Sequence, residues 1–249
     1  MNKKENLNYR DRAYEYYLTS QVGVKNQKDL LKEIKLRSTY IKKLIKKFFP
    51  VNRDIEILDI GCGYGAFLYN LNEMGYKKLS GVDGSSEQVF AARSLGLSQI
   101  SQSNIMNYLG AIPTSSKDFL IAYDVLEHQT KDELIGLMDE ILRVLKSNGQ
   151  LLIHVPNADG IFAGHMRYAD ITHEIAFTGQ SLKQLGAITG FNNIKVWEDK
   201  PVIHGIKSLV RYLLWEIMRL PMSVLAIVES GDIKTRNILT QNIIGIFVK

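Results

Sequence analysis

The sequence is poor in the features that mark secreted and membrane-spanning proteins. It has 249 residues and one cysteine, Cys62, so no disulfide can form within the chain, which is typical of a reducing compartment. The N-terminal stretch "MNKKENLNYRDRAYEYY" lacks the apolar segment of a signal peptide. No run of about 18 apolar residues is present. We therefore expect a cytoplasmic protein without a membrane-spanning helix.

The sequence also lacks internal repeats, low-complexity segments and a strong excess of one charge. Its net charge is +5, and much of the basic excess falls within residues 28–47, so charge alone does not indicate nucleic-acid binding. Apolar residues recur there at helical spacing, which predicts an amphipathic helix over 28–49 with a lysine face that is solvated or contacts an anionic surface. The length fits one large domain. We predict an N-terminal helical extension over residues 1–50 and the domain over 51–249.

Strands alternate with helices after Pro50, which predicts an α/β fold with a mainly parallel sheet. The expected strands cover residues 55–61, 78–83, 98–104, 118–124 and 149–156, and the expected helices cover 66–74, 86–96 and 131–146. Ligands of such sheets bind at the carboxyl ends of the strands, where the strand order reverses. The stretch "EILDIGCGYGAFL" ends the first strand with three glycines in five positions. A ligand is therefore expected to approach its backbone closely.

The glycine stretch leaves two classes of cofactor open. The loose pattern G-x-G-x-x-[GA] fits a nicotinamide dinucleotide, whereas the absence of G-K-[ST] excludes a phosphate P-loop. Asp59, just before the glycines, would repel a pyrophosphate and attract a cofactor with a cationic amine. Asp83 ends the next strand, where a carboxylate accepts hydrogen bonds from the ribose of either class. Asn104 follows the third strand and is expected to bind an adenine edge or to form an ordinary turn.

Four segments, in order, resemble the motifs of class I S-adenosylmethionine-dependent methyltransferases. They are "ILDIGCGYGAFL", "GVDGS", "DFLIAYDVLEH" and "EILRVLKSNGQLLIHVPN", and the resemblance runs from about Ile55 to Phe191. It implies a Rossmann-like seven-stranded sheet in which the last strand, "NILTQNIIGIFVK", is antiparallel and pairs with "NNIKVWED". It also implies S-adenosylmethionine as the cofactor, with its adenine amine contacted by Asn104. The implied cofactor contacts are Asp59, Gly61, Cys62, Gly63, Gly65, Asp83, Gly84, Asn104, Ile105 and Tyr123.

Histidines are the candidates for the chemistry. Methyl transfer needs a nucleophile aligned with the methyl group, and a hydroxyl nucleophile must also lose a proton. Histidine is the usual base near neutral pH. His128 closes "DVLEH" beside the expected cofactor site, where it would act in the chemistry or shape the cofactor pocket. His154 falls inside a predicted strand and is expected to be a buried histidine with satisfied hydrogen bonds.

The segment over residues 156–182 follows a strand at the carboxyl edge and is long enough to predict an active-site loop. Its text "RYADITHEIAFTGQSL" resembles a subgroup of bacterial methyltransferases associated with the synthesis of surface polysaccharide and lipopolysaccharide. That resemblance makes His173 the expected general base, oriented by Asp170 or Glu174. The alternative is that His173 pins the loop.

The same loop contains further candidates. Arg167 and Tyr168 would hold a polar or acidic acceptor. A divalent metal on Asp170, His173 and Glu174 is an alternative use of the cluster, but proximity in sequence does not establish ligand geometry. We expect no resident metal.

An apolar helical insertion is expected before the last strand, at about residues 203–235. Apolar residues form a broad face over residues 206–218, Pro221 is expected to break the helix, and "MSVLAIV" continues it. Three uses remain open: packing on the sheet or over the active site, a homodimer contact through 203–228, or peripheral docking at the inner face of the membrane.

We predict a methyltransferase that O-methylates a sugar hydroxyl of a surface glycan or its precursor. One alternative acceptor is a quinone precursor or a phenol, which would fit a narrow apolar pocket near Tyr123 and Phe177. Another alternative is a non-catalytic cofactor-binding scaffold in glycan assembly, and a nicotinamide oxidoreductase is opposed by Asp59. Nucleic acid is not an expected partner, because the N-P-P-[FYW] segment of base methyltransferases and an aromatic-rich basic channel are both missing.

Overall fold

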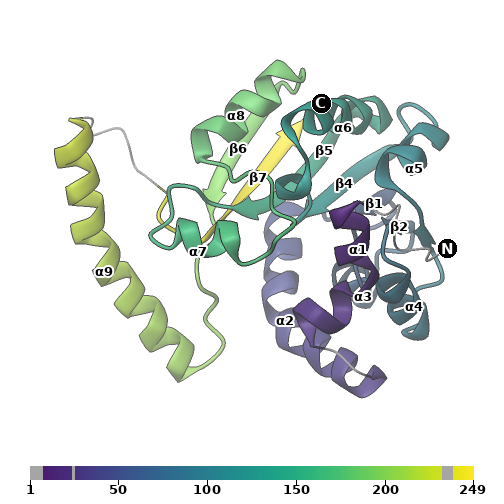
Figure 1. Ribbon diagram of the computed structural model, residues 1–249, viewed down its shortest axis with the longest axis horizontal. Coiled ribbons are helices and arrows are strands. Elements are labelled where there is room, and N and C mark those ends of the chain that lie inside the picture. The colour runs from purple at the N-terminus through teal and green to yellow at the C-terminus, as the bar shows by residue number, and fades with distance from the viewer. Residues whose placement is uncertain (1–7, 24–25, 232–237) are drawn as a thin grey trace.

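A seven-stranded sheet forms the centre of the protein in the computed structural model, which describes residues 8–23, 26–231 and 238–249 (Figure 1). The strand order is β3-β2-β1-β4-β5-β7-β6. β7 runs antiparallel to both of its neighbours, and the other neighbouring strands are parallel. The predicted α/β fold and its antiparallel last strand are confirmed. The strands are β1 (Ile57–Ile60), β2 (Leu79–Asp83), β3 (Ile100–Gln102), β4 (Lys117–Tyr123), β5 (Leu145–Pro156), β6 (Asn193–Glu198) and β7 (Asn242–Val248).

Helices cover both faces of the sheet, because its central strands are apolar on both sides. α2, α3 and α4 pack on one face, and α5, α6 and α8 pack on the other (Figure 1). Successive residues of β1 point to opposite faces, so Ile57 joins the first core and Leu58 joins the second. The six helices are α2 (Gln27–Phe48), α3 (Ala66–Glu73), α4 (Ser86–Ser94), α5 (Ile105–Ala111), α6 (Lys131–Val144) and α8 (Gly179–Ile188).

Local sequence signals set the first turns of the two longest of these helices. Asn26 caps α2, because its side chain accepts a hydrogen bond from the backbone N–H of Asp29. Thr130 and Glu133 form a reciprocal capping box at the start of α6. Both predicted helices are confirmed.

Some elements differ from those predicted. The sequence does not predict α5 or α8, because α5 is short and two glycines, Gly179 and Gly186, weaken the helical signal of α8. The third predicted strand is reduced to the three residues of β3. The prediction that Pro221 breaks the insertion helix is wrong, since α9 (Ile206–Ser230) continues through it. A proline removes one backbone hydrogen bond, and the turns on either side remain helical.

The N-terminal region packs onto the sheet and beside its ligand-binding edge. α2 buries Leu44 and Ile45 in the same core as β1. Leu18 is also buried, ahead of α2. Residues 1–7 and 24–25 of the predicted extension lie outside the described residues. The two short elements before α2 are α1 (Tyr9–Glu15) and the π-helical turn η1 (Leu18–Val22).

α9 stands apart at one end of the molecule (Figure 1). Polar side chains connect it to the body: Arg219 pairs with Glu198 at 2.8 Å, and Glu216 pairs with Lys200 at 2.9 Å. Its outer face is apolar and exposed, so of the three uses left open by the sequence, packing of this face on the sheet is not the one observed. The exposed side chains are Ile206, Leu209, Val210, Leu213, Leu214, Ile217, Met218, Leu220, Val224, Leu225 and Val228.

Within the described ranges, no helix, α9 included, is both long enough and apolar enough to cross a membrane. Residues 232–235 of the predicted insertion lie outside the described residues.

A buried histidine connects the ends of three strands. The ring nitrogens of His154 lie 2.5 Å from Asp124 Oδ1 and 3.3 Å from Asp199 Oδ2. The ring also stacks on Tyr123, with centroids 4.2 Å apart. Burial by itself lowers the pKa of His154, but Asp124 and Asp199 outweigh it and raise the pKa to about 10. The predicted core histidine with satisfied hydrogen bonds is confirmed, and its ring is a cation.

We predict that His154 makes stability fall as the pH rises above neutral. The unfolded histidine has a pKa of about 6.5, so the stabilisation is complete below that pH and is lost as the pH passes through the folded pKa. His154→Gln should lower the free energy of unfolding by on the order of 3 kcal/mol near neutral pH. Chemical denaturation across this pH range measures both effects, with the exposed His204→Gln as control. Equally steep pH profiles for the wild type and His154→Gln would contradict the prediction.

Candidate cofactor and active site

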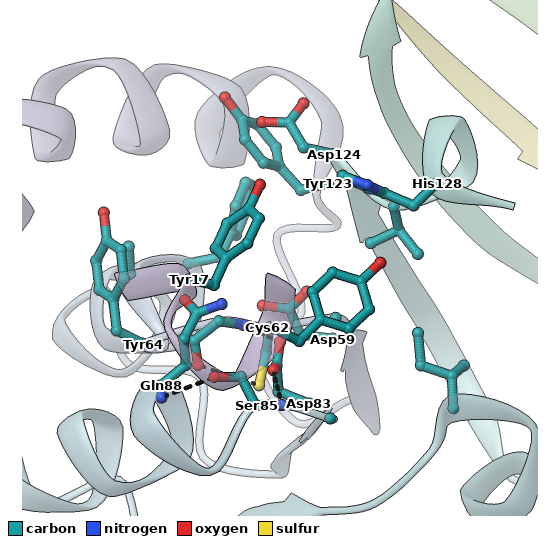
Figure 2. Close-up of a pocket in the computed structure, with 18 of the residues that line it drawn as sticks. Tyr17, Asp59, Cys62, Tyr64, Asp83, Ser85, Gln88, Tyr123, Asp124 and His128 are labelled. Carbon is teal, nitrogen blue, oxygen red and sulfur yellow. Dashed lines mark hydrogen bonds between the residues drawn. The ribbon is translucent and has the colours of Figure 1, made fainter. Parts of the chain in front are cut away.

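A cavity of about 990 Å³ opens at the carboxyl ends of β1, β2 and β4, where the strand order reverses between β1 and β4. The loop after β1 and the end of β2 form one end of the cavity, and the segment after β4 forms the other (Figure 2). Residues of α1 and α2, together with Tyr17, line the remaining side. A cavity of this size accommodates a nucleoside cofactor together with part of an acceptor.

The glycines after β1 allow a path that other residues would block. Gly61 and Gly65 have positive φ angles of 61° and 79°. A Cβ atom on Gly61 would lie 2.6 Å from Val125 Cγ2, and one on Gly65 would lie 2.5 Å from Leu97 Cδ1. Both positions therefore require glycine, because the backbone is left-handed there and neighbouring side chains of the protein fill the space of a Cβ atom.

Asp83 holds the glycine loop against the end of β2. Its carboxylate accepts hydrogen bonds from the backbone N–H groups of Gly63 and Ser85, each at 2.8 Å. Burial raises the pKa of Asp83, and these two hydrogen bonds act in the opposite direction. A carboxylate fixed in this way suits the expected contact with ribose hydroxyls.

Asp59 is buried beside Asp83 and faces the same cavity (Figure 2). Burial raises the pKa of Asp59 well above its usual range, and the charge of Asp83 adds to this effect. Two carboxylates at one end of a cavity attract a positively charged ligand and repel a pyrophosphate. The geometry thus favours a cationic cofactor over a dinucleotide.

The same segments identify the family of the protein. The methyltransferase domain family matches residues 34–196, which is more than half of the chain. The chain belongs to this family. Its mainly parallel seven-stranded sheet and glycine-lined cavity are those of a class I S-adenosylmethionine-dependent methyltransferase, so the cofactor expected from the sequence is confirmed.

Solved structures of other methyltransferases share this fold at low sequence identity. A SAM-dependent methyltransferase from Archaeoglobus fulgidus has a TM-score of 0.65 at 21% identity, over 88% of this chain and 99% of that one. Phosphoethanolamine N-methyltransferase 2 from Haemonchus contortus, in complex with S-adenosyl-L-methionine, has a TM-score of 0.63 at 16% identity, over 95% of this chain and 60% of that one. These identities show the fold alone.

One protein of uncharacterised function is related in sequence. It comes from Methanocaldococcus jannaschii and is 29% identical over 123 residues, which cover 47% of this chain and 48% of that protein. The methyltransferase therefore spans about half the length of this relative.

Of the ten expected cofactor residues in the methyltransferase, all except Gly65 line the cavity. Asn104 also caps α5, since its side-chain oxygen accepts hydrogen bonds from the backbone N–H groups of Met106 and Asn107. Both lone pairs of that oxygen are thus engaged. The expected contact with the adenine amine needs an acceptor, so the donor nitrogen of Asn104 suits an adenine ring nitrogen instead.

Two histidines meet at the other end of the cavity, next to the 3-10 turn η2 (Leu126–His128). The loop after β5 reaches this turn because the carbonyl of Glu127 accepts a hydrogen bond from the N–H of Glu174 at 2.7 Å. The His128 and His173 rings lie edge to face, with centroids 4.9 Å apart. His128 lines the cavity, and His173 is not among the lining residues.

Hydrogen bonds fix the orientation of both rings. His128 Nδ1 lies 2.8 Å from Thr172 Oγ1, whose own proton is donated to Asp170 Oδ1, so Nδ1 is the donor. His173 Nδ1 faces the carbonyl of Met166 at 3.1 Å and is likewise a donor. The Nε2 atoms therefore carry the lone pairs. Burial and the neighbouring His173 lower the pKa of His128 to about 4, so its ring is neutral.

The carboxylates expected to orient His173 have other partners. Glu174 lies 3.5 Å from Arg10. Asp170 accepts a hydrogen bond from the hydroxyl of Thr172, which in turn contacts His128. Within the described part of the chain, neither carboxylate hydrogen-bonds to His173, whose ring is oriented by a backbone carbonyl instead. Asp170, His173 and Glu174 also do not form the metal-ligand set considered from the sequence.

The residues expected to hold the acceptor do not line the cavity. Both belong to α7 (Ala163–Tyr168). The Arg167 guanidinium donates to the backbone carbonyls of His173 and Glu174, which braces the loop. Tyr168 is 81% exposed, and the Arg167 guanidinium lies over its ring, 5.3 Å from the ring centroid.

The N-terminal segment supplies a wall of the cavity that the sequence does not predict. Tyr14 and Tyr17 line the cavity together with Arg10 (Figure 2 shows Tyr17). The Tyr17 hydroxyl donates to Asp170 at 2.7 Å, and the Tyr14 ring lies 6.2 Å from that of His128. The available signal is the four tyrosines of "YRDRAYEYY", an unusual density for a polar segment.

We predict that Asp59→Asn stabilises the ligand-free methyltransferase and weakens S-adenosylmethionine binding by about tenfold or more. The folded state binds the Asp59 proton more tightly than the unfolded chain does, so the ionised carboxylate opposes folding at neutral pH, and an amide removes this cost. The same change removes the attraction to the cationic cofactor, and tenfold corresponds to about 1.4 kcal/mol.

Thermal unfolding measures the first effect, and calorimetric titration with S-adenosylmethionine, S-adenosylhomocysteine and NADH measures the second. NADH should not bind to the wild type. Asp139→Asn, on the exposed side of α6, is the matched control and should leave the affinity unchanged. A lower melting temperature with unaltered affinity, or tight NADH binding, would show that the role given to Asp59 is wrong.

Proposed function

We propose that this protein transfers the methyl group of S-adenosylmethionine to a sugar hydroxyl of a surface glycan or its precursor. The observation that carries the proposal is a neutral histidine, His128, on the wall of the cavity that also holds the cofactor residues (Figure 2). The methyl carbon and the acceptor oxygen must meet in line, with a proton acceptor close to the oxygen. The cofactor residues at one end of the cavity and His128 at the other support this alignment of methyl carbon, acceptor oxygen and base.

The proton-accepting role belongs to His128 in this proposal. The sequence favours His173, but His128 is the histidine that lines the cavity. Thr172 and Asp170 hold Nδ1 of His128 as a donor and leave Nε2 to accept the proton. Asp170 is then a positioning residue, and His173 packs against the base.

Polar side chains among the residues that line the cavity support a hydroxylated acceptor. Phe177, which would mark a narrow apolar pocket for a phenol, is buried and is not among the lining residues. Tyr123 is stacked against His154. The resemblance of the loop after β5 to the surface-polysaccharide subgroup is the reason for proposing a sugar as the acceptor. The polar side chains around the cavity include Arg10, Arg37, Asp124, Gln129 and Glu133.

We predict that His128→Gln binds S-adenosylmethionine like the wild type and loses methyl transfer by about 100-fold or more, the usual contribution of a positioned base. Transfer of a radiolabelled methyl group to nucleotide sugars and simple glycosides, compared with catechol, measures the effect. His165→Gln, an exposed histidine of the same loop, should keep full activity.

The outcomes separate the alternatives. Methylation of catechol in preference to every glycoside would identify the phenol class. Binding of S-adenosylmethionine without methyl transfer to any acceptor would indicate the alternative function, a non-catalytic scaffold in glycan assembly.

We also propose that the protein is cytoplasmic and that the apolar outer face of α9 docks on an anionic lipid surface, the inner face of the membrane. Glu216, the acidic side chain in the middle of the helix, is turned away from this face and pairs with Lys200 on the body. Lys207 and Arg211 flank the apolar residues, as in helices that lie at a membrane interface. The net charge of +5 adds attraction to anionic lipids.

We predict that vesicles containing phosphatidylglycerol bind the protein and that vesicles of phosphatidylcholine alone bind it weakly. The double variant Leu213→Ser and Ile217→Ser removes two exposed side chains from the outer face, so it should lower binding by about tenfold without changing the melting temperature. Ile188→Ser, exposed on α8, is the control. A dimer that the same double variant dissociates, with no vesicle binding, would show that a second copy of the chain covers this face instead.

A further inference from the structure

We propose that Glu127, His128 and His173 form a binding site for a divalent transition-metal ion beside the acceptor end of the cavity. The inference deepens the proposed function, because the ion would contact the acceptor oxygen. One ligand atom from each side chain lies within 4.8 Å of the other two. In the described ranges 8–23, 26–231 and 238–249, this is the one group of histidine, cysteine and acidic side chains that converges in this way.

The carboxylate of Glu127 is an independent indication of a ligand. Glu127 is 1% exposed, and its Oε2 atom has no hydrogen-bond partner in the described part of the chain. A buried carboxylate oxygen without a donor is unfavourable unless a cation or a proton satisfies it. The residue is held firmly, because its own carbonyl anchors the loop after β5 through the N–H groups of Glu174 and Ile175.

The two imidazoles are oriented in the manner of metal ligands. A ligating histidine usually donates its second ring N–H to a carbonyl or a carboxylate, which fixes the tautomer and directs the other nitrogen to the ion. His173 Nδ1 donates to the carbonyl of Met166. His128 Nδ1 donates to the Thr172 hydroxyl, which in turn donates to Asp170. Both Nε2 atoms are left with lone pairs for a metal.

The geometry requires a modest closure around the ion. Bonds of about 2.0–2.1 Å from zinc to nitrogen place neighbouring ligand atoms roughly 3.0–3.4 Å apart. The ligand atoms of the three side chains would therefore draw together by up to about 1.5 Å on binding the ion. Two imidazoles and one carboxylate leave coordination positions open for water or an acceptor oxygen.

Such an ion would activate the acceptor hydroxyl. Coordination lowers the pKa of a bound hydroxyl, so its proton passes to water and the oxygen stays on the metal as an alkoxide. The oxygen then forms a bond to the methyl carbon, the carbon–sulfur bond breaks, and its electron pair remains on the sulfur of S-adenosylhomocysteine. With the ion bound, His128 serves as a ligand, and loss of its side chain still removes methyl transfer.

Metal binding can be measured without turnover. The full-length protein, stripped with a chelator, is titrated with Co²⁺ while its visible absorption is recorded, and Zn²⁺ competition is followed by calorimetry. We expect one ion per chain, displaced by Zn²⁺. Glu127→Gln and His173→Gln should each weaken Co²⁺ binding by tenfold or more, and His165→Gln should leave it unchanged. Both site variants should bind S-adenosylmethionine like the wild type, which shows that they fold.

The outcomes distinguish this site from the proposed function. Absence of saturable Co²⁺ binding by the wild type, or binding that Glu127→Gln leaves intact, overturns the metal site. Full methyl transfer by metal-free protein in the presence of a chelator also overturns it and leaves the methyltransferase proposal standing. Stoichiometric Co²⁺ binding that depends on Glu127 supports the site even if no glycoside is methylated, and that second result would count against the acceptor alone.

Discussion

The burial of Asp59 and Asp83 side by side is the constraint on which the ligand-binding end of the molecule depends. Adjacent parallel strands end at the same edge, so their last carboxylates are brought together by the fold itself. Two backbone N–H groups compensate Asp83, whereas Asp59 stays buried with a raised pKa. A cationic cofactor bound at this end of the cavity would offset this cost. Glycines at 61 and 65 let the loop after β1 turn tightly beside these carboxylates, since a Cβ atom at either position would clash with Val125 or Leu97.

The opposite end of the cavity is assembled from segments that are distant in sequence. The turn after β4 carries His128, the loop after β5 brings His173 behind it, and the N-terminal segment adds Tyr17 through Asp170. Each contact depends on the others, since the Glu127 carbonyl anchors the loop that positions Thr172 against His128. The acceptor end of the cavity is therefore formed by contacts between segments distant in sequence, whereas the cofactor end is formed by short sequence motifs.

α9 differs from the helices on the sheet, because it exposes its apolar side chains instead of burying them in the core. Two of its charged side chains, Glu216 and Arg219, face the body in ion pairs with Lys200 and Glu198, and its apolar side chains are exposed. Helices that pack on a sheet bury their apolar stripe, so this inversion indicates a surface that something else covers. The proline within it, Pro221, leaves the helix continuous.

The sequence by itself predicted the α/β fold, and its resemblance to class I methyltransferases implied the antiparallel last strand. Nine of the ten residues expected to contact the cofactor line the cavity, because strand–loop–helix motifs are local and their glycines and carboxylates have few alternative uses. It could not assign Arg167, Tyr168, Asp170 and Glu174, since the loop that contains them looks alike in sequence whether its side chains face the cavity or brace its backbone. Only the tertiary structure decided that Arg167 braces the loop and that Asp170 acts through Thr172 on His128. The same holds for the tyrosines of the N-terminal segment and for Glu127, because long-range contacts carry no periodic signal. Short local motifs determined the residues at the cofactor end of the cavity, and packing between remote segments determined the residues at its other end.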